Sequence, residues 1–137
     1  MILPMKKKYY RSMYSLIKEF HFDLPYSFEE FIQMMSGMKN NYSYIISNPK
    51  IVGYLFCSVS PSFNHKTLIV NELVICLAPQ IIELFNSVVN FLFQTAYLHG
   101  CSQIIILKNN KIGINWHEYI QKNEMHSEVY NCKLTIV

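Results

Sequence analysis

Charged residues are scarce in this 137-residue chain, at 15% of the sequence, and the formal net charge is only +3. So mild a positive charge does not require a nucleic-acid partner. Paired cysteines are also lacking: the four cysteines are widely spaced and form no C-x-x-C motif, so a zinc or redox centre has no support. Cysteines of this kind are typical of buried free thiols in a reducing compartment.

The N-terminus lacks the apolar core and cleavage site of a signal peptide. The long apolar segment Ile81–Leu98 is interrupted at helical spacing by polar residues such as Glu83 and Asn90, which predicts an amphipathic helix and not a membrane span. The chain also contains no repeat, low-complexity tract or linker. We therefore expect a single domain over residues 1–137, without membrane association, in the cytoplasm.

Hydrophobic periodicity and turn residues predict alternating helices and strands. Ser27 and Glu30 form a capping box at the start of one helix, and Asn48-Pro49-Lys50 predicts a hairpin turn. The expected elements are a strand in Met1–Met5, helices at Tyr9–His21 and from Ser27 to Gly37, strands at Tyr44–Ser47, Ile51–Ser60 and Leu68–Leu77, a helix at Ile81–Leu98, a strand at Gln103–Leu107, a loop at Lys108–Gly113, a helix at Ile114–Gln121, and one strand or a pair in Glu124–Val137.

The segment from Leu68 to Leu107 predicts a strand–helix–strand unit. A short turn containing Pro79 leads from the first strand into the helix, and His99-Gly100 ends the helix before the second strand. A connection of this length makes the two strands parallel neighbours, with the helix crossing between them. It also directs the free N–H groups of the helix N-terminus at a site suited to an anion.

This order of elements resembles the GCN5-related N-acetyltransferase superfamily over nearly the whole chain. The residues that carry the resemblance are Ile51-Val52-Gly53-Tyr54 after the hairpin turn, Pro79 at the end of the fourth strand, Gly100 one helix length later, and Tyr119 four residues before the last turn. The resemblance implies an α+β fold with a mixed, mainly antiparallel sheet, flanking helices and a central parallel β-α-β crossover. Size and the spacing of Pro-Ser-Phe to Asn-Glu-Leu-Val look closest to small members from tailed phages.

The resemblance also implies a coenzyme A site. Its residues in this chain would be Leu73, Ile75, Gln80, Ile82, Glu83 and Phe85. Family members usually carry small residues where Glu83 and Phe85 stand, so that backbone amides can approach the pyrophosphate. A carboxylate about 5 Å from one phosphate charge costs roughly 3 kcal/mol at an effective dielectric near 20. Because Phe85 adds a steric obstacle, the sequence predicts only weak binding of coenzyme A.

Two residues would carry the family's chemistry. Glu72 stands where many members place the base that deprotonates the acceptor amine, and Tyr119 stands where they place the acid that reprotonates the leaving thiolate. Glu72 is equally well interpreted as a carboxylate on the solvent side of a strand, and the pattern favours a core or interface role for Tyr119.

From these departures we expect a protein that keeps the fold and has lost acetyl-CoA chemistry, with no cofactor and no metal. Such a protein would act through protein–protein contacts, as a phage or mobile-element product in the host cytoplasm or the virion. The alternative is an acetyl-CoA-dependent N-acetyltransferase with an atypical pyrophosphate loop. Whether the chain is an enzyme stays open at this point.

Aromatic residues make up 15% of the chain and gather near both ends. A small domain has little room to bury so many, so we expect an apolar surface that binds another protein or a second copy of the chain. Lys6, Lys7, Lys8 and Arg11 form a local basic cluster. A solvated charge run explains this cluster better than a nucleic-acid site does.

Overall fold

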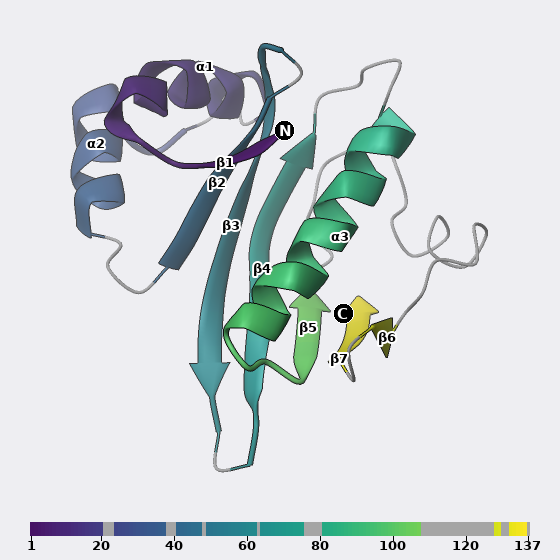
Figure 1. Ribbon diagram of the computed structural model, residues 1–137. Helices are drawn as coiled ribbons and strands as arrows, with labels where there is room; N and C mark the ends of the chain where they lie inside the picture. Colours follow the sequence, from purple (N-terminus) through teal and green to yellow (C-terminus); the bar gives the residue numbers. More distant parts are fainter. Residues whose placement is uncertain are drawn as a thin grey trace.

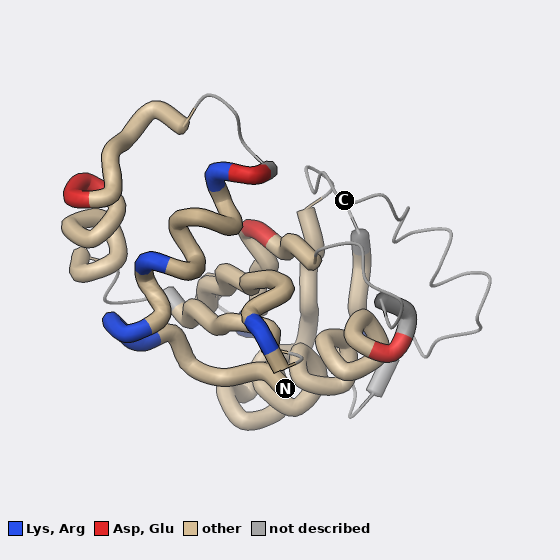
Figure 2. Tube along the Cα trace, turned by 90° about the horizontal axis from the view of Figure 1, so that it is seen from above, with Lys and Arg blue, Asp and Glu red and all other residues tan. Residues whose placement is uncertain are grey.

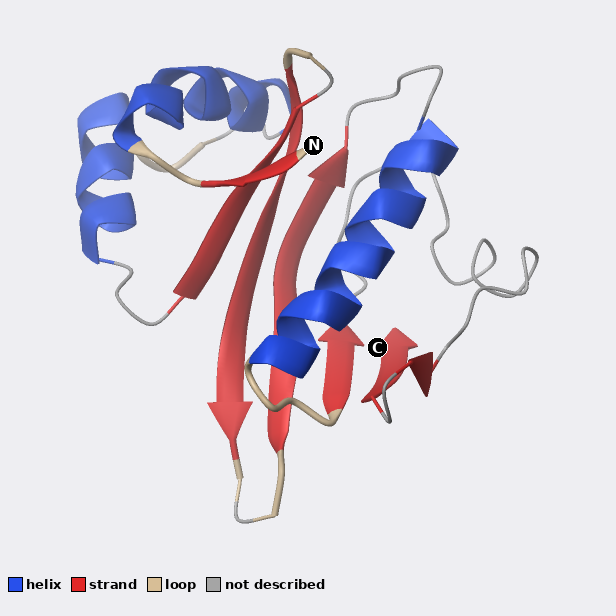
Figure 3. Ribbon diagram, viewed as in Figure 1, coloured by secondary structure: helices blue, strands red, loops and turns tan. Residues whose placement is uncertain are grey.

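The computed structural model describes residues 1–20, 24–37, 41–47, 49–62, 64–75, 81–107, 128–129 and 132–136. Figure 1 shows one mixed sheet with helices packed against it, and Figure 3 shows the same view coloured by secondary structure. In chain order the elements are β1 (Ile2–Pro4), a 3-10 turn η1 (Lys7–Tyr9), α1 (Tyr10–Phe20), α2 (Phe28–Gly37), β2 (Asn41–Ser47), β3 (Ile51–Pro61), β4 (Lys66–Ile75), α3 (Ile81–Leu98), β5 (Gln103–Ile106), β6 (Glu128–Val129) and β7 (Cys132–Ile136).

The seven strands are ordered β1-β2-β3-β4-β5-β7-β6. Strands β1 to β4 form an antiparallel meander, as the predicted hairpin requires. β2 begins three residues before the predicted Tyr44, because β3 is long enough to pair with it as far as Asn41, opposite Ser58. The hairpin was therefore predicted correctly, but its first strand is longer than predicted.

The capping box at the start of α2 is confirmed. The backbone N–H of Ser27 donates to Glu30 Oε1 at 3.3 Å, and the N–H of Glu30 donates to Ser27 Oγ at 3.3 Å. The two bonds satisfy donors that the first turn of a helix leaves without intrahelical partners. They fix the point at which the chain enters α2, and so the course of the loop that precedes it.

The predicted parallel crossover is also confirmed. β4 and β5 pair in parallel from Thr67 opposite Gln103 to Val70 opposite Ile106, and α3 connects them. Gly100 ends the helix with φ of 69°, a left-handed conformation that glycine adopts without steric cost. The fold class is therefore α+β, with a mixed sheet and a parallel β-α-β unit at its centre.

Helices cover both faces of the sheet, and the view from above in Figure 2 shows the helices on its two sides. On one face Phe91 of α3 packs against Tyr44 of β2, with ring centroids 4.7 Å apart. On the other face α1 packs against β3, and α2 packs against α1. Each helical layer closes over buried side chains of β3 and β4: Leu55 and Leu73 lie on the face of α3, and Tyr54 and Val74 lie on the other face.

The C-terminal region contains a pair of strands. β6 and β7 are antiparallel, and β7 lies between β5 and β6 and runs parallel to β5. This second parallel pairing was not predicted. The predicted loop at Lys108–Gly113 and helix at Ile114–Gln121 lie outside the described residues. Within the described ranges, no helix is both long and apolar enough to cross a membrane.

Candidate functional site

A β-bulge interrupts the pairing of β3 with β4 near the middle of the sheet. Phe56 pairs with Glu72, but the next residue, Cys57, pairs with Val70, so Asn71 is the extra residue. A bulge of this kind redirects side chains and increases strand twist, and bulges are common beside active sites. Here Asn71 and Glu72 both bond to β3 side chains: Asn71 Nδ2 donates to Ser58 Oγ at 3.0 Å, and Glu72 accepts from Tyr54.

The bulge coincides with the end of the β4–β5 ladder. The parallel pairing stops at Val70, with a last backbone hydrogen bond from Leu107 N to Val70 O at 3.3 Å. β4 itself continues to Ile75, paired with β3. Among the described residues, the two parallel strands are thus paired along the first half of β4.

The N-terminus of α3 lies at the same end of the molecule as the carboxyl end of β4 (Figure 1). α3 begins at Ile81, with residues 76–80 between it and the last residue of β4. An 18-residue helix presents free N–H groups and a partial positive charge at this end. This is the arrangement that the sequence predicted for an anion site.

Glu72 is a half-buried carboxylate held by a buried phenol. The Tyr54 hydroxyl donates a hydrogen bond to Glu72 Oε1, and the Tyr54 side chain is fully buried. Burial, together with this hydrogen bond and the charge of Glu72, raises the pKa of Tyr54 far above its usual value. Tyr54 therefore remains a neutral donor at physiological pH.

A second tyrosine, Tyr26, lies close to the same carboxylate. Burial first, and then the charge of Glu72, raise the pKa of Tyr26. Tyr14 Oη donates to the backbone carbonyl of Tyr26 at 3.1 Å, and the rings of Tyr26 and Phe31 stack with centroids 6.3 Å apart. These contacts fix the segment before α2 beside Glu72.

The predicted coenzyme A residues divide into three groups. The side chains of Leu73 and Ile75 are fully buried in the core, so only their backbone atoms can contact a ligand. Glu83 is exposed in the first turn of α3. Gln80, Tyr119 and the side chain of Ile82 lie outside the described residues.

The expected position of Phe85 is wrong. Its side chain is fully buried in the core cluster that includes Leu73 and Val88, and does not project into the anion site. The first backbone N–H groups of α3 point out of the end of the helix, toward the anion site. The side chain of Phe85 points sideways from the helix, toward the sheet. Phe85 therefore does not create the predicted steric obstacle.

Sequence reasoning missed the tyrosines that surround Glu72. Tyr54 entered only as part of the pattern Ile51-Val52-Gly53-Tyr54, and Tyr26 was not singled out. The register of a hairpin could have suggested Tyr54 as a diagonal neighbour of Glu72. The bulge at Asn71, which changes that register, had no signal in the sequence.

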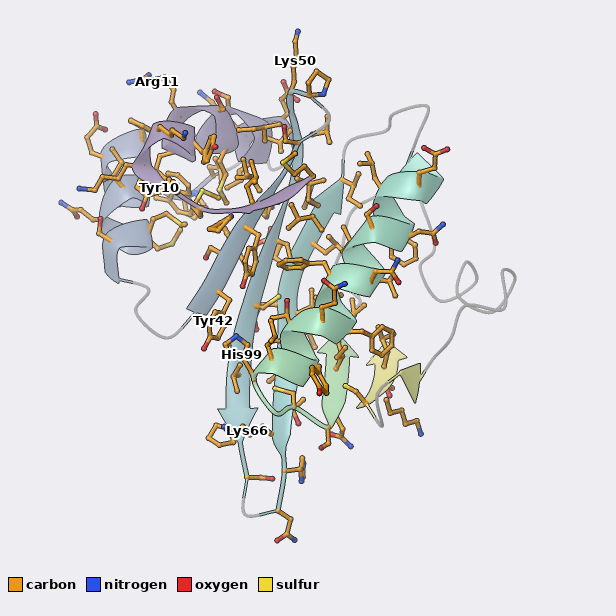
Figure 4. The ribbon with its side chains drawn as sticks, viewed as in Figure 1. Tyr10, Arg11, Tyr42, Lys50, Lys66 and His99 are labelled. Carbon is orange, nitrogen blue, oxygen red and sulfur yellow. The ribbon has the colours of Figure 1, made fainter. Side chains whose placement is uncertain are left out.

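A cavity of about 320 Å³ lies elsewhere, at the edge of the sheet where β1 ends beside β2. Its lining includes Tyr10, Tyr42 and Tyr44 but not Glu72. Figure 4 shows Tyr10 on the helical side of this edge and Tyr42 near His99 at the end of α3. Among the described histidine, cysteine, aspartate and glutamate residues, no group of three could hold a metal ion.

The sequence matches no family model, and no curated protein sequence matches it at a significant level. Solved structures share its fold. An acetyltransferase from Trypanosoma brucei has a TM-score of 0.69 and 15% identity, with 98% of both chains covered. Glucosamine-6-phosphate N-acetyltransferase from Arabidopsis thaliana has a TM-score of 0.68 and 16% identity, covering 94% of this chain and 92% of its own. A transcriptional regulator from Bacillus halodurans C-125 has a TM-score of 0.68 and 16% identity, covering 94% of this chain and 96% of its own.

At these identities the likeness establishes the fold, which is that of the GCN5-related N-acetyltransferases. The expectation of a phage or mobile-element protein that has lost acetyl-CoA chemistry is wrong. Structural neighbours that match over nearly their whole length are named as acetyltransferases, and the steric argument depended on a position of Phe85 that the structure does not have. The expectation that no cofactor is used has no support either.

The predicted protein partner stays a prediction. In the described ranges, the large apolar side chains that are most exposed are Met1, Met34, Tyr97 and Leu98. Tyr97 and Leu98 are adjacent at the end of α3, whereas Met1 and Met34 belong to other parts of the chain.

Proposed function

We propose that this protein is an acetyl-CoA-dependent N-acetyltransferase that uses Glu72 as its general base. One observation carries the proposal: a half-buried carboxylate lies on β4 just past Val70, where the pairing with β5 ends. That position places a proton acceptor on the part of β4 that extends beyond its described pairing with β5. The alternative interpretation of Glu72, a solvent-facing residue without a role, does not explain its buried tyrosine partner.

Acetyl-CoA supplies an activated acyl group as a thioester. Transfer forms a bond between the acceptor nitrogen and the acetyl carbon and breaks the carbon–sulfur bond, which leaves coenzyme A as a thiolate. A protonated acceptor amine loses two protons on its way to an amide. Glu72 would accept one, with its carboxylate oriented by Tyr54, and the other would pass to the coenzyme A thiolate, which leaves as the thiol.

The residues of the helix N-terminus fit a pyrophosphate better than the sequence suggested. Phe85 is buried below the site, so the first N–H groups of α3 are not covered by its ring. Glu83 remains an opposing charge, but its side chain is exposed. Water and salt screen an exposed carboxylate, so its cost is smaller than the roughly 3 kcal/mol expected for a fixed charge about 5 Å away.

β4 provides the second part of the fit. The side chains of Leu73 and Ile75 are buried, and the strand extends beyond its pairing with β5. A strand that ends near the N-terminus of α3 can lie alongside an extended, amide-containing chain such as pantetheine. The contribution of this region to affinity would therefore depend on backbone geometry more than on side-chain identity.

Calorimetric titration of the purified protein with coenzyme A and acetyl-CoA tests the proposal directly. We expect saturable binding of both, and thiol release when acetyl-CoA and a primary amine are added together. A titration with no saturable binding up to millimolar ligand would overturn the proposal. Binding without release of the coenzyme A thiol in the presence of any amine would indicate a coenzyme A-binding protein without transferase activity. It would also exclude Glu72 as a general base.

A further inference from the structure

Aromatic side chains border Glu72 on the face of the sheet that α1 covers. Phe56 lies directly opposite Glu72 in the register of β3 and β4 and is half-buried. Its ring centroid is 5.1 Å from that of Tyr54, whose hydroxyl holds the carboxylate. Half-buried Tyr26 approaches the same group from the segment before α2. The carboxylate thus has flat apolar surfaces beside it.

A carboxylate next to aromatic rings is suited to a cationic amine. The charge pairs with the carboxylate, while the face of a ring attracts the ammonium group and the apolar atoms attached to it. Phe56 and Tyr26 offer ring surface that is not fully enclosed by the core. An aromatic or similarly flat body on the amine would cover that surface.

The single carboxylate of Glu72 can balance one positive charge on a ligand. Among the acidic residues that the structure describes, Glu72 alone contributes to raising the pKa of both Tyr26 and Tyr54, after the larger effect of burial. The Glu30 carboxylate at the start of α2 is held by the backbone N–H of Ser27. A ligand with several amines would leave its additional charges without a second carboxylate shown beside Glu72 among the residues that the structure describes.

The outer rim of the same aromatic cluster carries a cation, Arg11. The guanidinium of Arg11 lies 4.6 Å from the ring centroid of Phe28, and Phe28 packs edge-on against Tyr14 at 5.5 Å. Figure 4 shows Arg11 on the outer side of α1, and Figure 2 shows basic residues gathered along η1 and α1.

We propose that the acetyl acceptor is a primary monoamine carried on an aromatic body, bound against Phe56 and Tyr26 with its nitrogen at Glu72. The inference rests on the proposed function, because it specifies the acceptor for the same site. It distinguishes this chain from enzymes whose acceptors are polyamines or amino sugars.

The test compares kcat/KM for four acceptors with the wild-type protein and saturating acetyl-CoA: 2-phenylethylamine, n-butylamine, spermidine and glucosamine. We expect 2-phenylethylamine to exceed each of the others by at least about tenfold. Phe56→Ala should raise the KM for 2-phenylethylamine about tenfold and change that for n-butylamine much less. Phe91→Ala is the matched control, since Phe91 is also half-buried but packs on Tyr44 across the sheet.

Binding of 2-phenylethylamine without acetyl-CoA, followed by saturation-transfer NMR, provides a readout independent of turnover. Turnover that favours spermidine or glucosamine would overturn the acceptor assignment and leave the proposed function intact. If no amine is acetylated, the proposed function fails, and the NMR experiment still decides whether the site recognises an aromatic monoamine. Loss of the NMR signal in Phe56→Ala, with retention in Phe91→Ala, is the supporting result; no signal in the wild-type protein overturns the assignment.

Discussion

Tyr54 and Glu72 are joined by a hydrogen bond that runs diagonally between β3 and β4. The directly opposed pairs are Tyr54 with Val74 and Phe56 with Glu72, so the phenol reaches from one pair to the next. A hydroxyl buried as deeply as that of Tyr54 requires a partner, and Glu72 supplies one. The bond in turn restricts the rotamers of Glu72. The folded core, through Tyr54, therefore fixes the position of the Glu72 carboxylate.

Replacing Glu72 by glutamine tests its role as a base. Glutamine keeps the shape of the side chain and can still accept the hydrogen bond from Tyr54, but it cannot take a proton at physiological pH. We expect kcat for amine acetylation to fall at least about a hundredfold, with the affinity for coenzyme A unchanged within about twofold. Steady-state kinetics and calorimetry on the same preparation measure both. Undiminished kcat in Glu72→Gln would show that another group accepts the proton.

Replacing Tyr54 by phenylalanine tests the positioning of that carboxylate. The variant keeps the buried ring and removes the donor, so we expect the free energy of unfolding to fall by about 1–2 kcal/mol. We also expect kcat to fall about tenfold, with the affinity for coenzyme A unchanged, because the carboxylate has lost the donor that fixes its orientation. Tyr44→Phe is the control, since Tyr44 packs against α3 on the other face. A kcat in Tyr54→Phe that is no lower than in Tyr44→Phe would restrict Tyr54 to a structural role.

Most of the fold could be predicted because local signals agree with the tertiary structure. The capping box at Ser27 and the stop at Gly100 both act over a few residues, and the structure contains both. Strand ends were less accurate: β2 extends to Asn41 because a partner strand is present, and a partner is not visible in local sequence. The parallel pairing of β5 with β7 depends on the same kind of long-range information.

The site was harder to predict than the fold. Glu72 was placed on the correct strand, but its tyrosine neighbours depend on a bulge and on the loop before α2. Phe85 shows the opposite error, since alignment to a glycine motif gave it a place in the anion site. A helix residue is directed by its angle around the helix axis, and a large apolar side chain is most stable facing the sheet. The gain in free energy from burying Phe85 therefore determined its position, and the alignment to the motif did not predict it.

The burial of Phe85 gives a prediction of its own. Phe85→Ala should lower the free energy of unfolding by about 3–5 kcal/mol, because it opens a cavity in the core beneath α3. Glu83 lies two residues earlier and is exposed, so Glu83→Gln should change the free energy of unfolding by less than about 1 kcal/mol. The same variant should strengthen coenzyme A binding a few-fold, because it removes a negative charge. Urea denaturation and calorimetry measure the two effects. Stronger coenzyme A binding in Phe85→Ala with unchanged stability would return Phe85 to the site.

Gly53 marks a close approach between β3 and β4. A Cβ atom at this position would lie 2.2 Å from the backbone oxygen of Val74, which cannot move without breaking the sheet. We expect Gly53→Ala to lower the free energy of unfolding by about 2–3 kcal/mol. Gly37→Ala is the control, since nothing lies within 4 Å of a Cβ there, and it should be neutral or stabilising by up to about 1 kcal/mol. Equal denaturation midpoints for the two variants would contradict the close approach.

The buried thiol of Cys57 makes stability depend on alkaline pH. Burial raises its pKa from 9.0 to about 12. Between these values the unfolded chain has lost the thiol proton and the folded chain has kept it, so deprotonation favours unfolding and stability falls as pH rises from about 9 to about 12. A shift of this size corresponds to about 4 kcal/mol when fully developed.

Urea denaturation at several pH values tests this dependence in the wild-type protein and in Cys57→Ala. We expect the alkaline loss of stability to be smaller in the variant, whatever its stability at pH 7, because the slope with pH reports only the difference in bound protons. Tyr44 and Tyr54, whose pKa values are also raised, contribute to the remaining slope in both proteins. Identical slopes in the two proteins between pH 9 and 11 would mean that the Cys57 thiol ionises as readily in the folded chain as in the unfolded one.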